Sequence, residues 1–157
     1  YYIKKRTNTH LKINKNVLKN FKQEKKYGLN KFITYKNFAQ KVIASRLKLK
    51  KIFRNIKAKN ERIIGYGATA KSCTVLNYCN LGKNEIEFFY DTTSFKINKY
   101  LPGTKIKIKK YKPLDVNEAK YVFLGAWNFK SEIFKKEKIF IKNGGKFITH
   151  IPSPKII

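Results

Sequence analysis

A glycine-rich stretch at residues 65–71, Gly-Tyr-Gly-Ala-Thr-Ala-Lys, has the spacing with the clearest chemical meaning in this chain. Small residues stand at Gly65, Gly67 and Ala70, after an apolar run and before a helical pattern. Such residues let the backbone approach a phosphate, and the N–H groups at a helix start donate to it. With Asp91 at the end of the next apolar run, this is the pattern of a dinucleotide-binding fingerprint. A tight turn between a strand and a helix also needs glycine for steric reasons alone.

One cation, Lys71, stands in the first turn of the expected helix. A positive charge is unfavourable at that end of a helix dipole, which indicates an anion nearby. In a chain so rich in lysine, a side chain that simply faces solvent explains the residue equally well. Both interpretations of Lys71 stay open.

Other candidates follow later strands. Asp91 would meet a ribose or another polar group of a ligand, or it is a simple carboxylate at a strand end. Trp127 follows an apolar run, so its indole would stack on a base or sugar, and Asn128 is expected to cap the next helix. Residues 100–103, Tyr-Leu-Pro-Gly, predict a type II turn, and residues 92–99 before it are expected to line the pocket.

The elements that must position these residues alternate after residue 60. Strands are predicted at residues 62–65, 86–90, 105–108, 121–126 and 146–151, and helices at residues 69–81, 114–119 and 128–143. Alternating strands and helices are typical of an α/β, Rossmann-like three-layer domain with a mostly parallel sheet. Ligands bind outside the carboxyl ends of such strands, where all the candidate residues are expected.

The first part of the chain has a different pattern. A long amphipathic helix is predicted over residues 34–59, with Thr34 as its N-cap and a basic face that is interpreted as solvated. A short helix is expected at residues 15–26, and residues 1–6 resemble a strand without an obvious partner. We therefore expect a connecting segment at residues 1–33 and one domain at residues 34–157.

The net charge of +28 would ordinarily favour nucleic acid or an anionic membrane surface. Arginine, which reads bases and phosphates best, supplies only Arg6, Arg46, Arg54 and Arg62. Lysine, asparagine, isoleucine, phenylalanine and tyrosine are abundant together, as an AT-rich coding sequence would give. We therefore expect neither a nucleic-acid nor a membrane partner, although the positive field favours a phosphorylated ligand.

The remaining composition indicates a cytoplasmic protein. No apolar stretch approaches the roughly 20 residues of a membrane span, and no signal-peptide pattern opens the chain. Cys73 and Cys79 lack metal-ligand spacing, so we expect free thiols and no metal. The chain contains no Met, which suggests a piece of a longer protein.

Several loops together carry a resemblance. The matching residues are 65–68, 70–71, 74, 76–79, 91, 99–104, 127–130, 144–148 and 151–152. They are similar, in order and spacing, to the C-terminal domain of SAM-dependent sugar C-methyltransferases, which methylate a carbon of a nucleotide-linked deoxysugar. The family pattern runs approximately GYGAPAKGNT, so this chain departs from it at Thr69, Ser72 and Cys73.

The resemblance implies how the work is divided in the intact enzyme. A preceding domain, which residues 1–6 would end, binds SAM and supplies the base that removes a proton beside a sugar keto group. The resulting enolate attacks the SAM methyl group. This chain would hold no cofactor and no catalytic residue, and it would bind the nucleotide sugar, expected to be a thymidine diphosphate sugar. The implied substrate-binding residues are Gly65, Tyr66, Gly67, Ala68, Ala70, Lys71, Asn77, Asp91, Trp127 and Asn128. The rival functions are an NAD-binding module and a basic nucleic-acid-binding domain.

Overall fold

The computed structural model describes residues 3–10 and 12–157. The chain forms two compact units, Tyr1–Val42 and Ile43–Ile157, and the division falls inside one long helix. Among the described residues, no helix combines the length and the apolar character that crossing a membrane requires.

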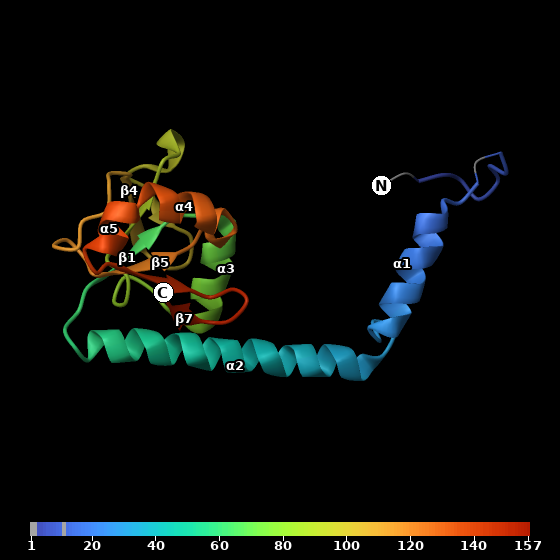
Figure 1. The fold of residues 1–157 in the computed structure, drawn as a ribbon, viewed down its shortest axis with the longest axis horizontal. Helices are drawn as coiled ribbons and strands as arrows, with labels where there is room; N and C mark the ends of the chain where they lie inside the picture. Colours follow the sequence, from blue (N-terminus) through green and yellow to red (C-terminus); the bar gives the residue numbers. More distant parts are fainter. Residues whose placement is uncertain (1–2, 11) are drawn as a thin grey trace. The chain divides into compact units, whose positions relative to one another are not determined.

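The first unit contains α1 (Lys15–Lys26) and the beginning of α2 (Phe32–Lys57), as Figure 1 shows. The short helix at residues 15–26 is confirmed. The helix predicted over residues 34–59 begins two residues earlier, at Phe32, and ends at Lys57. The Thr34 hydroxyl donates to the carbonyl of Gly28 at 2.8 Å instead of capping. The strand expected at residues 1–6 was wrong for residues 3–6, which form no strand, and residues 1–2 lie outside the described residues.

The second unit is built on a seven-stranded sheet with the order β3-β4-β2-β1-β5-β6-β7. Its strands are β1 (Ile63–Tyr66), β2 (Phe88–Asp91), β3 (Tyr100–Leu101), β4 (Ile106–Lys110), β5 (Tyr121–Leu124), β6 (Lys146–Thr149) and β7 (Lys155–Ile156). The five inner strands, in the spatial order β4-β2-β1-β5-β6, are parallel to one another. The edge strands β3 and β7 are antiparallel to their neighbours. The sequence prediction found the parallel strands and missed the two edges, which are too short to show a pattern.

Helices complete the second unit. They are α3 (Ala70–Cys79), α4 (Lys130–Lys136) and α5 (Lys138–Lys142), with short 3₁₀ turns η1 (Ser94–Lys96) and η2 (Trp127–Phe129). The single helix predicted at residues 128–143 was wrong, because the chain breaks at Glu137. The carboxylate of Glu137 is buried and accepts hydrogen bonds from Tyr111 Oη at 2.7 Å and Leu114 N–H at 3.1 Å.

The short helix predicted at residues 114–119 was also wrong. The chain turns there instead, because the side chain of Asp115 accepts from the N–H of Asn117 at 2.9 Å, and its carbonyl accepts from Glu118 and Ala119. An aspartate that bonds to the backbone two residues later offers the chain an alternative to helix.

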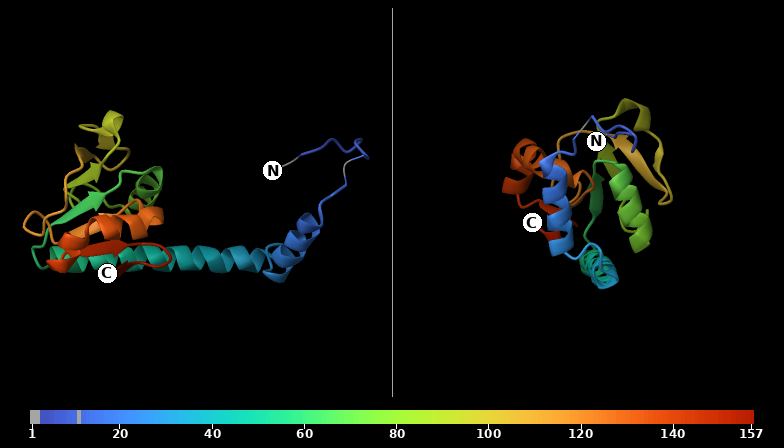
Figure 2. Two further views of the ribbon diagram at one scale, coloured as in Figure 1. Left: turned by 45° about the horizontal axis from the view of Figure 1, so that its top comes forward. Right: turned by 90° about the vertical axis from the view of Figure 1, so that its right-hand side faces the viewer.

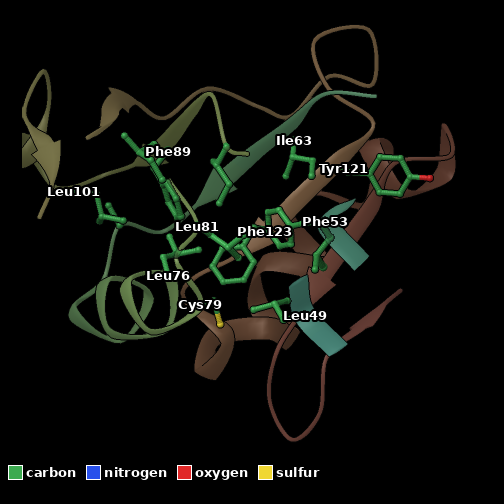
Figure 3. Packing of buried hydrophobic residues seen from close by; sticks show 14 of the residues in the cluster. Leu49, Phe53, Ile63, Leu76, Cys79, Leu81, Phe89, Leu101, Tyr121 and Phe123 are labelled. Carbon is green, nitrogen blue, oxygen red and sulfur yellow. The ribbon is translucent and has the colours of Figure 1, made fainter. Parts of the chain in front are cut away.

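Two apolar clusters sandwich the sheet. One joins it to α3 and to the part of α2 within this unit, through Leu49, Phe53, Leu76 and Phe123, as Figure 3 shows. The other includes Ile133 of α4 and Phe140 of α5. These two helices cover the face of the sheet opposite α3, as Figure 2 shows. The α/β fold class with a mostly parallel sheet is therefore confirmed, and the carboxyl ends of β1, β2 and β5 meet at one edge.

Candidate functional site

The chain leaves β1 through a turn that only glycine permits. Gly67 has a φ of +81°, and its N–H donates to the carbonyl of Tyr90 at 2.8 Å. A Cβ atom at this position would lie 2.5 Å from the Cβ of Ala126, after β5. Gly65 has a different role, because a Cβ there would lie 2.5 Å from the ring of Phe89 in the core. The turn is therefore packed tightly between the ends of β2 and β5.

The start of α3 is closed by a reciprocal cap. Thr69 Oγ1 accepts from the N–H of Ser72 at 3.1 Å, and Ser72 Oγ accepts from the N–H of Thr69 at 2.9 Å. Two of the positions that depart from the family pattern thus form one capping box. Across the described residues, no protein acceptor receives the N–H groups of Ala70 and Lys71. Two donors at the positive end of the helix dipole are left for a ligand or water.

Asp91 ties the glycine turn to the loop after β2. Its Oδ2 accepts from the N–H of Ala68 at 2.8 Å and from Lys96 Nζ at 3.2 Å, and its Oδ1 accepts from the N–H of Thr93 at 2.8 Å. Burial acts to raise the pKa of Asp91, but the hydrogen bonds from Thr93 and the ammonium of Lys96 hold it below its ordinary value. Lys96 also donates to the carbonyl of Ala68 at 2.9 Å. Both oxygens of this ionised carboxylate therefore already accept hydrogen bonds from groups of the protein.

Lys71 and Trp127 lie together on the β5 side of α3. Lys71 is exposed, and its Nζ stands 5.1 Å from the centroid of the half-buried indole. Asn128 was predicted to cap the following helix, and that was wrong. It is exposed within η2, while α4 begins after Phe129 without a side-chain cap.

Behind Trp127 lies a buried histidine. His150 follows β6, is 3% exposed, and stacks on Phe123 with ring centroids 5.4 Å apart. Neither of its ring nitrogens has a hydrogen-bond partner within the described part of the chain. Burial lowers the pKa of His150 to about 4, so the imidazole is neutral near pH 7.

Asn77 supports a turn on the far side of α3. Its Nδ2 donates to the carbonyl of Pro102 at 3.0 Å and to that of Cys73 at 2.8 Å. The type II turn predicted at residues 100–103 lies one residue later, at residues 101–104, where Gly103 has a φ of +76° and the N–H of Thr104 donates to the carbonyl of Leu101 at 3.2 Å. Asn77 therefore positions the loop after β3.

Two hollows flank the turn at Thr69. The larger, here called the α3 cavity, has a volume of about 480 Å³ and lies between the start of α3 and residues 95–102. The smaller, the strand-end cavity, has about 280 Å³ and lies where β1, β2 and β5 end. Thr69 and Lys96 line both of them. A hollow of about 740 Å³ beside the start of β2 contains none of the predicted site residues.

Three residues of the strand-end cavity region form a linked group. Tyr66 and Tyr111 line the cavity with ring centroids 5.6 Å apart, and Tyr111 donates to Glu137. Burial and the nearby Glu137 carboxylate raise the pKa of Tyr66 to about 12, and the same causes raise that of Tyr111. Both phenols are neutral donors at pH 7. Sequence reasoning named only Tyr66, because no local pattern relates Tyr111 and Glu137 to it.

The structure thus brings most of the predicted residues to one edge. Tyr66, Gly67, Ala68, Ala70 and Asp91 line one cavity or the other, while Lys71 and Trp127 stand beside them and line neither. No group of His, Cys, Asp and Glu side chains that could hold a metal ion occurs among the residues that the structure describes.

Comparison with known proteins identifies a family and a relative. A family model described as the C-methyltransferase C-terminal domain matches residues 1–152. The C-methyltransferase NovU of Streptomyces niveus is 36% identical over 135 residues, which cover 86% of this chain and 32% of NovU. The chain therefore spans about a third of the length of that relative.

Proposed function

Because the chain belongs to the family of C-methyltransferase C-terminal domains, we propose that its second unit binds the sugar-nucleotide substrate of a SAM-dependent C-methyltransferase. The observation that carries this proposal is the start of α3. Two unoccupied backbone donors, the positive end of a helix dipole and two lysines, Lys71 and Lys96, gather there. A diphosphate is the anion that such a site suits.

SAM suits this site poorly. The methyl donor carries a sulfonium and an ammonium against one carboxylate, and Lys96 lines both cavities beside α3. We therefore place the SAM site and the catalytic base in another part of the longer polypeptide. The role of this unit is to bind and orient the sugar nucleotide.

An NAD-binding module is the main rival. In a dinucleotide site the carboxylate at the end of the second strand receives the ribose hydroxyl. Here the oxygens of Asp91 already accept from Ala68, Thr93 and Lys96. This arrangement favours the sugar nucleotide over NAD.

We propose that residues 1–33 pack on the methyltransferase part of the longer polypeptide. The apolar side chains of α1, among them Val17, Leu18 and Phe21, are exposed in this unit. A relative that is about three times as long as the aligned segment leaves room for a domain that covers them. The same face would otherwise expose a contiguous apolar stripe to water.

Calorimetric titration of the chain with a thymidine diphosphate sugar, SAM and NAD tests the proposal. We expect the sugar nucleotide to bind and the other two to bind far more weakly or not at all. Lys71→Ala should weaken sugar-nucleotide binding by about 1–3 kcal/mol if Lys71 contacts the anion. Tighter binding of SAM or NAD than of the sugar nucleotide would overturn the assignment.

A further inference from the structure

We propose that the α3 cavity holds the nucleoside of the substrate, with the base stacked between Phe95 and Tyr100. This inference rests on the proposed function and adds the position of the nucleoside and its base. The volume of about 480 Å³ lies within the range of small-molecule sites, whereas the strand-end cavity, at about 280 Å³, falls below it.

Two exposed aromatic side chains line this cavity. Phe95 is 69% exposed in η1 and Tyr100 is 62% exposed in β3, although each is large and flat. Exposed aromatic faces at a single hollow are typical of surfaces on which bases stack. Neither side chain belongs to the two apolar clusters of the second unit. Packing of the core therefore does not explain an aromatic residue at either position.

The backbone that carries these rings is held in place. The N–H of Asn98 donates to the carbonyl of Ile108 at 2.9 Å, and the N–H of Ile108 donates to the carbonyl of Lys99 at 2.8 Å. Lys96 fixes the other end of the segment through Asp91 and Ala68. A preformed cavity costs little conformational entropy to occupy, so stacking contributes to affinity directly.

The charges around the cavity indicate a nucleotide rather than a neutral aromatic ligand. Lys96 and Lys99 line it, and Ala70, with its unoccupied N–H, lies at the opposite wall. A base between the rings therefore has cations and a helix start within the same hollow for its phosphates. The sugar then lies toward the strand-end cavity, which shares Thr69 and Lys96.

One cysteine reports on this cavity. Cys73 lines it and is half-buried, whereas Cys79, in the same helix, is buried at 2% exposure. Burial raises the pKa of both thiols, so labelling is carried out near pH 8.5. A ligand in the cavity should shield Cys73 from a maleimide, and Cys79 is the internal control that stays unreactive.

The experiment titrates thymidine diphosphate into the chain and into the variants Phe95→Ala and Tyr100→Ala. Each variant should weaken binding by about tenfold or more, because a stacked face is lost. Phe38→Ala is the matched control, since Phe38 is 65% exposed and belongs to the first unit, and it should leave the affinity unchanged. The nucleotide should also slow Cys73 labelling at least tenfold.

The possible results separate this inference from the proposed function. Binding that keeps its affinity in both aromatic variants and leaves Cys73 unprotected would overturn the base position and leave the substrate class intact. Failure of the wild-type chain to bind either thymidine diphosphate or its sugar would overturn both. Circular dichroism and thermal melting verify that the variants fold, as expected for substitutions at exposed side chains.

Discussion

The two parts of α2 differ in burial although they belong to one helix. Phe32 is 82% exposed and Phe38 is 65% exposed, whereas Leu49 and Phe53 are each 1% exposed. Both parts show apolar residues at helical spacing. Periodicity therefore predicts the helix and its apolar stripe, but it does not tell whether a partner for the stripe is within the chain.

The sheet of the second unit explains the difference in burial between the two parts of α2. In the second unit, Phe53 packs on Phe123 of β5 with ring centroids 5.9 Å apart, and Leu49 belongs to the same cluster. The first unit contains no buried hydrophobic core residue within its described part. We infer that the second unit carries most of the stability of this chain.

The largest expected effect is on the buried part of α2. Phe53→Ala should lower the free energy of unfolding by about 3–5 kcal/mol, since it removes a buried ring and leaves a cavity. Phe38→Ala should change it by less than about 0.5 kcal/mol. Urea unfolding followed by circular dichroism measures both, and similar losses in the two variants would break the comparison.

The two histidines extend the comparison to pH. His150 is buried in the second unit and His10 is exposed in the first. The pKa of His150 in the folded state, about 4, lies below the ordinary 6.5, so protonation favours the unfolded chain. The contribution of neutral His150 to the free energy of unfolding should be fully present above pH 6.5. It should fall by about 3 kcal/mol as the pH approaches 4, at about 1.4 kcal/mol for each pKa unit.

His150→Leu should flatten that dependence, while His10→Gln should preserve it. The lowered pKa of Asp91 also favours the folded state, but its contribution is lost only as the pH falls below about 4. The pKa of Glu87 is also lowered, by its hydrogen bond with Arg62, and its contribution begins to be lost near its ordinary value of 4.5. Urea unfolding between pH 5.5 and 6.5 therefore isolates the histidine. An unchanged slope in His150→Leu would show that another group titrates there.

A smaller effect concerns two glycines with positive φ. Gly67→Ala should lower the stability of the second unit by about 2 kcal/mol, from backbone strain and from contact with Ala126. Gly28 has a φ of +69° in the first unit, where a Cβ would meet only side-chain atoms of Thr34 and Lys31. Gly28→Ala should leave the cooperative melt of the second unit unchanged, and calorimetry compares the two transitions.

The sequence predicted what local patterns encode. The parallel strands, the glycine turn and the start of α3 follow from apolar runs, Gly67 and the residues that favour a cap. The roles of Lys96 and Glu137 depend on contacts with residues far along the chain, so no local spacing predicted them. The broken helix at Glu137 has the same cause, because a long-range hydrogen bond to Tyr111 outweighed helical periodicity.

The central claim is that an anionic group of the sugar nucleotide binds the N–H groups at the start of α3. Ala70→Pro removes one of these donors at the first helical position, where proline is tolerated, and Thr69 already has the extended backbone that a following proline requires. Ala70→Ser is the matched control, because it keeps the N–H. Titration with a thymidine diphosphate sugar should give an affinity about tenfold weaker or more for Ala70→Pro, at an unchanged melting temperature, and a near wild-type affinity for Ala70→Ser. Wild-type affinity in a folded Ala70→Pro variant would contradict the account.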